Sequence, residues 1–169
     1  VMVMPDDIMK RLCFSALLAA MVCIARLFFK VPIPLGYAHL GNGFILLGCS
    51  MMGGYYGIFI AGFGSALADL LGGFGQWILP TLVIKGLMGF AVGRIADPDG
   101  TGFRLASVRS FLAAVVGTAI MVAGYTLFGA LLSGSLAAGL AQIPGLVGEG
   151  IVGIIVFYIS GAALRRISF

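Results

Sequence analysis

The stretch Gly43–Leu71 reads GFILLGCSMMGGYYGIFIAGFGSALADLL, an apolar run with glycines near its middle and one acidic residue, Asp69, near its end. A membrane-spanning helix needs about 20 apolar residues, because the hydrocarbon core is about 30 Å thick and each residue rises about 1.5 Å. Two helices, 43–56 and 57–73, joined by a tight turn at Gly53–Gly57, are therefore predicted here. One long helix bent at the same glycines is the alternative.

The whole chain has the composition of an integral membrane protein. Of its 169 residues, 61% are hydrophobic and 9% are charged, and its mean hydropathy is +1.16. Soluble globular domains carry about 25% charged residues, so that class is excluded. An all-α, multi-pass protein of the cell membrane is predicted, with residues 1–169 forming one domain of six transmembrane helices. The predicted spans are 9–29, 43–56, 57–73, 79–96, 105–132 and 142–164.

The positions of lysine and arginine predict the orientation, because cytoplasmic loops carry an excess of these residues. With the N-terminus inside, seven of the ten basic residues lie on the cytoplasmic side. These seven are Lys10, Arg11, Arg94, Arg104, Arg109, Arg165 and Arg166. Arg26 and Lys30 fall outside and Lys85 falls within the membrane. Both termini are therefore predicted to be cytoplasmic, and the net charge of +4 reflects topology rather than nucleic-acid binding.

Three charged residues, Asp69, Lys85 and Glu149, lie inside apolar segments. A charge at the bilayer centre costs about 2.5 to 3.5 kcal/mol on insertion scales, so such residues usually face a protein interior or a cavity. Counting residues from the outer loops places all three at a similar depth. They are expected to line one cavity in the outer half of the membrane. Further residues expected around its mouth are Tyr37, His39, Asn42, Gln76 and Trp77.

The three charges have two interpretations. Asp69 and Lys85 can neutralise each other and lock two helices together, which leaves Glu149 without a partner. If all three are ionised instead, one positive and two negative charges favour a ligand with a cationic or protonatable ring nitrogen over a phosphate.

Catalytic and metal-binding chemistry find little support in the sequence. The single histidine, His39, excludes a His-rich metal site, and the three cysteines lack metal-ligand spacing. No nucleotide-binding loop is present, and Ser65 has Asp69 one turn away but no histidine base. The chain is therefore predicted to be neither an enzyme nor a cofactor protein.

Small residues four apart allow close packing between helices in lipid. Most such pairs, including Gly53/Gly57 and Gly89/Gly93, are expected to pack helices within the subunit. Ala16 and Ala20 lie in the cytoplasmic half of the first helix, with Ser15 and Ala19 beside them. They are expected to form a smooth strip on which a helix of another protein lies.

Five short segments resemble one family when taken in order. They are HLGNG (39–43), GFGSALADL (62–70), PTLVIKGLMG (80–89), VAGY (122–125) and IPG (143–145). Together they are similar to substrate-binding S components of energy-coupling factor (ECF) vitamin transporters, in the branch of hydroxymethylpyrimidine and pyridoxine-type carriers. An amide is common in that branch near the position of Glu149, where this chain has a carboxylate.

The resemblance implies a carrier that binds a vitamin or vitamin precursor outside the cell and releases it inside. It also implies a transmembrane coupling subunit and two ATP-binding cassette ATPases as partners, with Ala16 and Ala20 in the docking surface. The ligand-binding residues are expected to have three roles. Asn42 and Lys85 donate hydrogen bonds, Asp69 and Glu149 accept them, and the rings of Trp77 and Tyr125 stack on the ligand.

Alternatives remain for the aromatic residues and for the function. Trp77 can instead be an anchor at the outer headgroup level, and Tyr125 a packing residue. A self-sufficient small-molecule or ion transporter, with the three charges as a relay, is the second function. A structural membrane subunit is the third. The three charges lie in the outer half of the predicted bundle, and no path of polar residues continues from them through the cytoplasmic half, which disfavours the relay.

Overall fold

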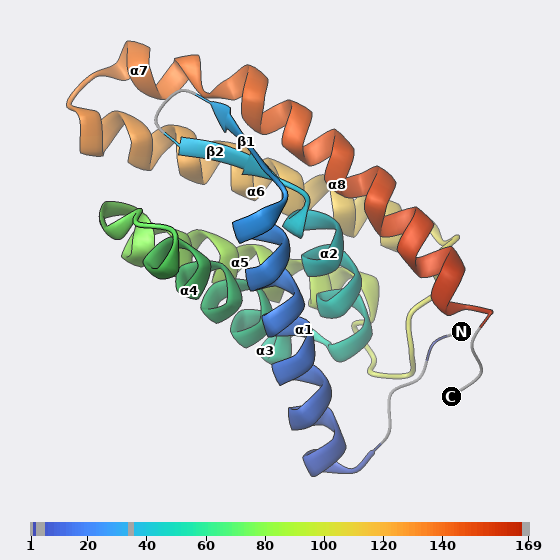
Figure 1. Ribbon diagram of the computed structural model, residues 1–169. Helices are drawn as coiled ribbons and strands as arrows, with labels where there is room; N and C mark the ends of the chain where they lie inside the picture. The colour runs from blue at the N-terminus through green and yellow to red at the C-terminus, as the bar shows by residue number, and fades with distance from the viewer. Residues whose placement is uncertain (1, 3–5, 34–35, 167–169) are drawn as a thin grey trace.

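The computed structural model describes residues 2, 6–33 and 36–166, and it is a bundle of helices with one small hairpin (Figure 1). The helices are α1 (Ile8–Phe28), α2 (Gly41–Met52), α3 (Gly54–Gly57), η1 (Ile58–Phe63), α4 (Gly64–Leu71), η2 (Gly75–Trp77), α5 (Ile78–Ala96), α6 (Val108–Ser133), α7 (Leu136–Ala141) and α8 (Ile143–Leu164). The strands are β1 (Lys30–Ile33) and β2 (Gly36–His39).

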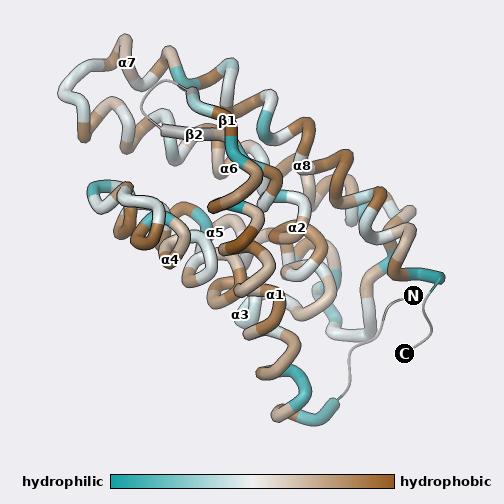
Figure 2. Tube along the Cα trace, in the orientation of Figure 1, coloured by the Kyte–Doolittle hydropathy of each residue, from teal (hydrophilic) through white to brown (hydrophobic). Residues whose placement is uncertain are grey.

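Five helical runs are long and apolar enough to cross a membrane. They are Ile8–Phe28, Gly54–Leu71, Gly75–Ala96, Val108–Ser133 and Leu136–Leu164. Helix α2 is apolar but shorter than these five. Large apolar side chains cover the outside of the bundle, and apolar colouring dominates the helices in Figure 2. This distribution is that of a membrane protein, because lipid rather than water surrounds the exposed apolar side chains.

The stretch Gly43–Leu71 folds as two helical runs and not as one bent helix. Helix α2 ends at Met52, and Gly53 has a φ of +88°, in the region that favours glycine. The next run contains a π-helical turn, η1, between α3 and α4.

Glycines bring α3 and α5 into backbone contact. A Cβ atom on Gly89 would lie 2.2 Å from the carbonyl oxygen of Gly57, and one on Gly57 would lie 2.5 Å from that of Gly89. No side chain fits at either position. This contact holds α5 against the run that carries Asp69.

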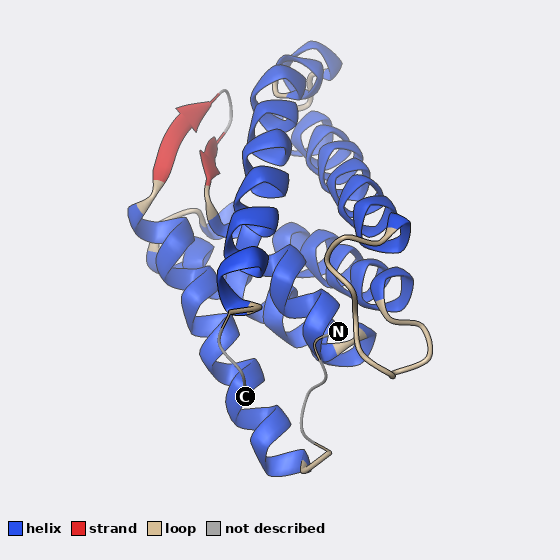
Figure 3. Ribbon diagram, turned by 90° about the vertical axis from the view of Figure 1, so that its right-hand side faces the viewer, coloured by secondary structure: helices blue, strands red, loops and turns tan. Residues whose placement is uncertain are grey.

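The loop between the first two helices contains a β-hairpin that the all-α prediction missed. Strands β1 and β2 pair antiparallel, with Lys30 opposite His39 and Ile33 opposite Gly36. Figure 3 shows the two strands at one end of the molecule, beside the helices. The strands are four residues long and include Pro32 and Gly36, which are depleted in strands, so no sequence pattern announced them. The hairpin places His39 at the entrance of α2.

Candidate functional site

A cluster of charged and polar side chains lies buried near the hairpin. Arg26 of α1 and Asp69 of α4 are 3% and 1% exposed, and Arg26 Nη2 donates to Asp69 Oδ1 at 2.8 Å. The prediction placed Arg26 near the outer end of the helix over 9–29 but gave it no role in the cavity, whereas α1 turns Arg26 inward.

The spacing of residues along α1 indicates that Arg26 is buried. The buried residues of α1 are Ser15, Ala19, Val22, Cys23, Ala25 and Arg26. Steps of four and three along this face match a helical period, so Arg26 continues an apolar stripe. A cation on such a stripe predicts a buried anion opposite it.

Asp69 is also connected to a chain of hydroxyl groups. Thr81 Oγ1 donates to Asp69 Oδ2, and it lies 2.9 Å from the hydroxyl oxygen of Tyr125. The ring of Trp77, itself 6% exposed, packs on the Tyr125 ring with 5.4 Å between centroids. Trp77 and Tyr125 are therefore both part of the wall of this cluster. Thr81 was not predicted.

The second half of the cluster connects Lys85, Asn42 and Glu149. Lys85 Nζ donates to Asn42 Oδ1, and Asn42 Nδ2 donates to Glu149 Oε1 at 2.7 Å. The Lys85 ammonium also lies 4.0 Å from Glu149 Oε1 and 5.5 Å from the centroid of the Tyr125 ring. In the described part of the chain, the recorded hydrogen-bond partners of Asp69 and Lys85 differ, so these contacts do not favour the helix lock between the two residues.

Formal charges balance in this cluster, which consists of Arg26, Lys85, Asp69 and Glu149. The prediction of one positive and two negative charges omitted Arg26. All four side chains are at most 6% exposed. A balanced cluster removes the argument for a net cationic ligand, and the argument against a phosphate remains because both cations already have anionic neighbours.

His39 connects the two halves of the cluster. Its Nε2 lies 3.2 Å from Glu149 Oε1 and contacts Arg26 Nη1, while the Gly41 amide donates to its Nδ1 at 3.0 Å. Burial, followed by the charges of Arg26 and Lys85, holds the pKa of the His39 imidazole well below its ordinary value. The ring is therefore neutral at physiological pH.

Acidification should destabilise the protein more than it destabilises a His39→Gln variant. In the unfolded chain His39 takes up a proton near pH 6.5, whereas the lowered pKa keeps the folded ring neutral there. Below that pH the unfolded state binds more protons, so stability falls as the pH falls, by roughly 1 kcal/mol at pH 5.5. Melting temperatures at pH 7.5 and 5.5 test this. Equal drops in both proteins would assign the acid sensitivity to other groups.

Two predicted residues of the mouth remain, Tyr37 and Gln76, and the side chain of Tyr37 lies outside the described part of the structure. Gln76 is exposed in η2 and lies outside the cluster. A different amide, Gln142, is 2% exposed and donates to the Tyr125 carbonyl oxygen at 3.2 Å. It was missed because a neutral side chain at a helix end carries no strong sequence signal.

The predicted strip on α1 is narrower than expected. Ala16 and Ala20 are exposed, as a docking surface requires. Ser15 and Ala19 are 1% and 5% exposed, so they do not widen the strip. Ala19 instead faces the fourth helix, where a Cβ atom on Gly64 would lie 2.8 Å from its carbonyl oxygen.

A groove of about 440 Å³ adjoins the cluster between the hairpin and α8. Its lining residues are Phe28, Phe29, Lys30, Val31, Ala38, His39, Leu40, Gly145, Gly148, Glu149 and Val152. Most of this wall is apolar, and His39 and Glu149 belong to both the groove and the cluster. In the part of the chain that the structure describes, the polar contacts of Glu149 all run through Oε1. No contact of its Oε2 is recorded among these residues.

Glycine keeps the groove open along α8. A Cβ atom added to Gly148 would meet no atom within 4 Å. Ligand pockets are typically 300 to 1,000 Å³, mostly apolar, with a few polar groups that orient the ligand. This groove has that size and composition. Within residues 2, 6–33 and 36–166, no three His, Cys, Asp or Glu side chains are placed to hold a metal ion.

Comparisons with known proteins agree with this architecture. A family model described as "ECF-type riboflavin transporter, S component" matches residues 8–166. A protein of Pyrococcus woesei, described as "Uncharacterized protein in gap 3'region", is 37% identical over 106 residues, which are 62% of this chain and 68% of that protein.

A solved structure has a similar fold. It is described as "Structure and mechanism of the S component of a bacterial ECF transporter" and superposes with a TM-score of 0.66 over 95% of this chain and 98% of the other. The two sequences are 20% identical, so this likeness speaks to the fold alone.

Proposed function

This chain belongs to the family of ECF-type riboflavin transporter S components, and we propose that it captures a small vitamin or vitamin precursor from outside the cell. An S component is a substrate-binding subunit and not an enzyme. We further propose six membrane spans, the five long helical runs and the shorter helix α2, with both termini in the cytoplasm. The excess of lysine and arginine at one end of the bundle supports this orientation.

One observation carries the proposed site: Glu149 belongs to the buried cluster through its carboxylate and also lines the groove. The proposed ligand donates a hydrogen bond to Glu149, and its ring packs on the apolar walls beside the hairpin. Asn42 and Lys85 hold Glu149 in place from behind. The Lys85 ammonium has three donors and one hydrogen-bond acceptor among the described residues, Asn42, so it can also donate to a ligand.

Asp69, Trp77 and Tyr125 complete the proposed site from the other side. Asp69 accepts hydrogen bonds, and the two aromatic rings, tilted by 47° to each other, offer faces on which a planar heterocycle can pack. Gln76 has no role in this proposal because it is exposed.

The proposed ligand is a flat, unphosphorylated heterocycle of the pyridoxine or hydroxymethylpyrimidine type. Riboflavin, which the family description names, shares a planar ring and the lack of a phosphate, and it serves as the comparison. A phosphate ester would bring about two negative charges into a charge-balanced, buried cluster, and burial of unpaired charge is costly.

Binding assays with matched pairs of ligands test this ligand class. Trp77 is the only tryptophan of the chain, so quenching of its fluorescence reports binding directly. Pyridoxine, hydroxymethylpyrimidine and riboflavin are compared with their phosphate esters, and small molecules retained through purification are identified by mass spectrometry. We expect at least one unphosphorylated ligand to bind at least tenfold more tightly than its ester. Tighter binding of the esters would contradict the proposal.

The proposed partners are a transmembrane coupling subunit and two ATP-binding cassette ATPases. Ala16 and Ala20 are exposed on α1 and offer a smooth contact for the coupling subunit. Co-purification with an ATPase complex supports this arrangement. Transport by the purified chain alone in liposomes would instead support a self-sufficient transporter, with the buried charges as its relay.

Filling the groove should abolish ligand binding without unfolding the protein. Gly148→Leu places a side chain in open space, and leucine is also the better helix former by up to about 1 kcal/mol. We expect at least tenfold weaker binding and an unchanged or raised melting temperature. Val147→Leu enlarges a half-exposed neighbour outside the groove and serves as the control. Equal affinities of Gly148→Leu and the control would place the ligand elsewhere.

A further inference from the structure

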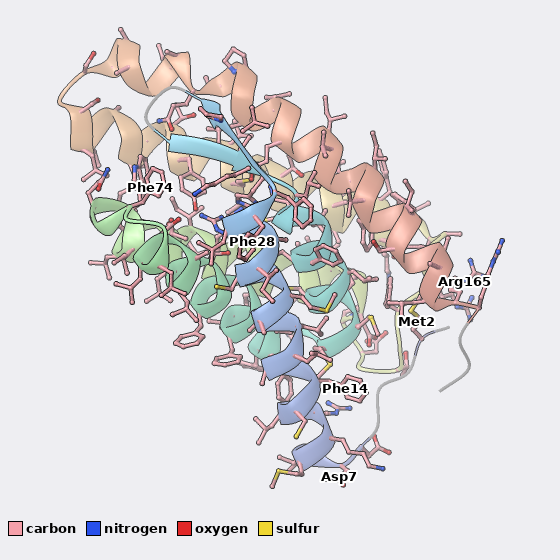
Figure 4. All side chains as sticks on the ribbon, in the orientation of Figure 1. Met2, Asp7, Phe14, Phe28, Phe74 and Arg165 are labelled. Atoms are coloured by element: carbon pink, nitrogen blue, oxygen red, sulfur yellow. The ribbon has the colours of Figure 1, made fainter. Side chains whose placement is uncertain are left out.

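A second cavity, of about 330 Å³, lies between the start of α6 and the end of α8. Arg104 and Arg165 line it, together with Ser107 and the apolar side chains of Met2 and Phe103. Figure 4 shows Met2 and Arg165 together near the end of α8, away from Phe28 and Phe74. This cavity is therefore separate from the proposed vitamin site.

The two arginines bring positive charge that nearby acids do not balance. Both side chains are exposed. The ion pairs recorded at this end are Arg109 with Asp99 at 3.9 Å and Arg11 with Asp6 at 3.8 Å. Among the described residues, neither Arg104 nor Arg165 has an acidic partner. Two uncompensated guanidinium groups at one cavity favour an anion.

Other polar groups of this region are already engaged. Asp97 accepts from the amides of Thr101 and Gly102 at 3.1 and 2.9 Å, so its carboxylate is held within its own loop. The Ser107 hydroxyl donates to the Arg104 carbonyl oxygen at 2.7 Å. The arginine side chains therefore remain as the free donors of the cavity.

The cavity lies at the edge of the lipid-facing region. Helix α6 begins at Val108, which is 84% exposed, and α8 ends at Leu164, so the cavity stands where two candidate spans end. Lipid headgroups occupy this level of a membrane. Arginine forms two parallel hydrogen bonds with a phosphate, and basic pockets between helix ends bind anionic headgroups. Phe103 is 1% exposed and gives the cavity an apolar floor.

We propose that this cavity binds the phosphate group of an anionic phospholipid in the adjacent leaflet, between Arg104 and Arg165. The proposal is independent of the vitamin site and of its ligand. A soluble phosphate has the same binding chemistry, so the test separates the two sources.

Lipid retention by the full chain tests the proposal. The protein is exchanged into nanodiscs of equal phosphatidylglycerol and phosphatidylcholine, and the lipids that remain after release into detergent are counted by native mass spectrometry. We expect phosphatidylglycerol to be retained preferentially, and Arg104→Ala/Arg165→Ala to reduce its retention at least tenfold. Arg109→Ala/Arg166→Ala removes the same charge from the same end but leaves the cavity intact, and it should retain the lipid.

Three outcomes would overturn the proposal. These are no preference for phosphatidylglycerol, equal losses in the two double variants, and displacement of the lipid by millimolar inorganic phosphate, which would assign the cavity to a soluble anion. Arg104→Lys/Arg165→Lys preserves charge if the alanine variant fails to fold. It should weaken retention, because lysine cannot donate in the bidentate geometry.

Discussion

Replacing Arg26 by methionine should lower the free energy of unfolding by about 3 to 5 kcal/mol, the usual cost of removing one partner of a buried ion pair. Arg26 donates to Asp69 at 2.8 Å and contacts His39, and all three side chains are at most 4% exposed. Methionine has a similar length and leaves little void, so the loss of unfolding free energy measures the cost of leaving the buried Asp69 carboxylate without its cation. Unfolding by titration with SDS, followed by circular dichroism, provides the measurement.

A double variant separates charge from packing. Arg26→Met combined with Asp69→Asn removes both charges, and most of the lost stability should return, because no buried charge is left unpaired. Lys30→Met removes an exposed cation of the hairpin next to the cluster and should cost less than about 1 kcal/mol. If Arg26→Met lowers the free energy of unfolding no more than Lys30→Met does, the buried ion pair does not stabilise the fold.

The sequence predicted the residues of the site whose charged side chains have a high free energy in lipid. Asp69, Lys85 and Glu149 stood out because charges in apolar segments need an interior partner, and the structure brings them into one cluster. Asn42 was expected at the mouth of the cavity, and Tyr125 entered through the family resemblance. The number of helical runs in Gly43–Leu71 followed from the glycines, since Gly53 adopts a φ that other residues avoid.

The missed features have physical reasons. Arg26 was counted by the rule that assigns loop charges to sides of the membrane, which does not consider the face of the helix that an arginine occupies. Thr81 and Gln142 are neutral, so they do not stand out in an apolar segment as a charge does, and the hydrogen bonds that satisfy them are not visible in the sequence. The groove depends on where the hairpin lies against α8, a contact between segments about 110 residues apart that no local pattern encodes.

Replacing Glu149 by glutamine should weaken ligand binding by roughly 10- to 100-fold, because hydrogen bonds to charged groups contribute about 1.5 to 3 kcal/mol. Glutamine keeps the length of the side chain and an oxygen that can accept from Asn42, while it removes the charge that faces the groove. The dissociation constant is measured by quenching of Trp77 fluorescence, with the ligand that binds the wild-type protein most tightly. An unchanged dissociation constant would remove Glu149 from the site.

A second substitution distinguishes binding from stability in this variant. Glu149→Gln also deprives Lys85 of the carboxylate 4.0 Å away, so the melting temperature should fall. Adding Lys85→Met removes the unpaired cation and should restore much of that stability, whereas ligand affinity should stay low because the carboxylate is still missing. If affinity instead recovers together with the melting temperature, Glu149 acts by holding the helices in place. Continued weak binding in a stable double variant would show that the loss of affinity does not come from lost stability, because Lys85 is itself a proposed donor to the ligand.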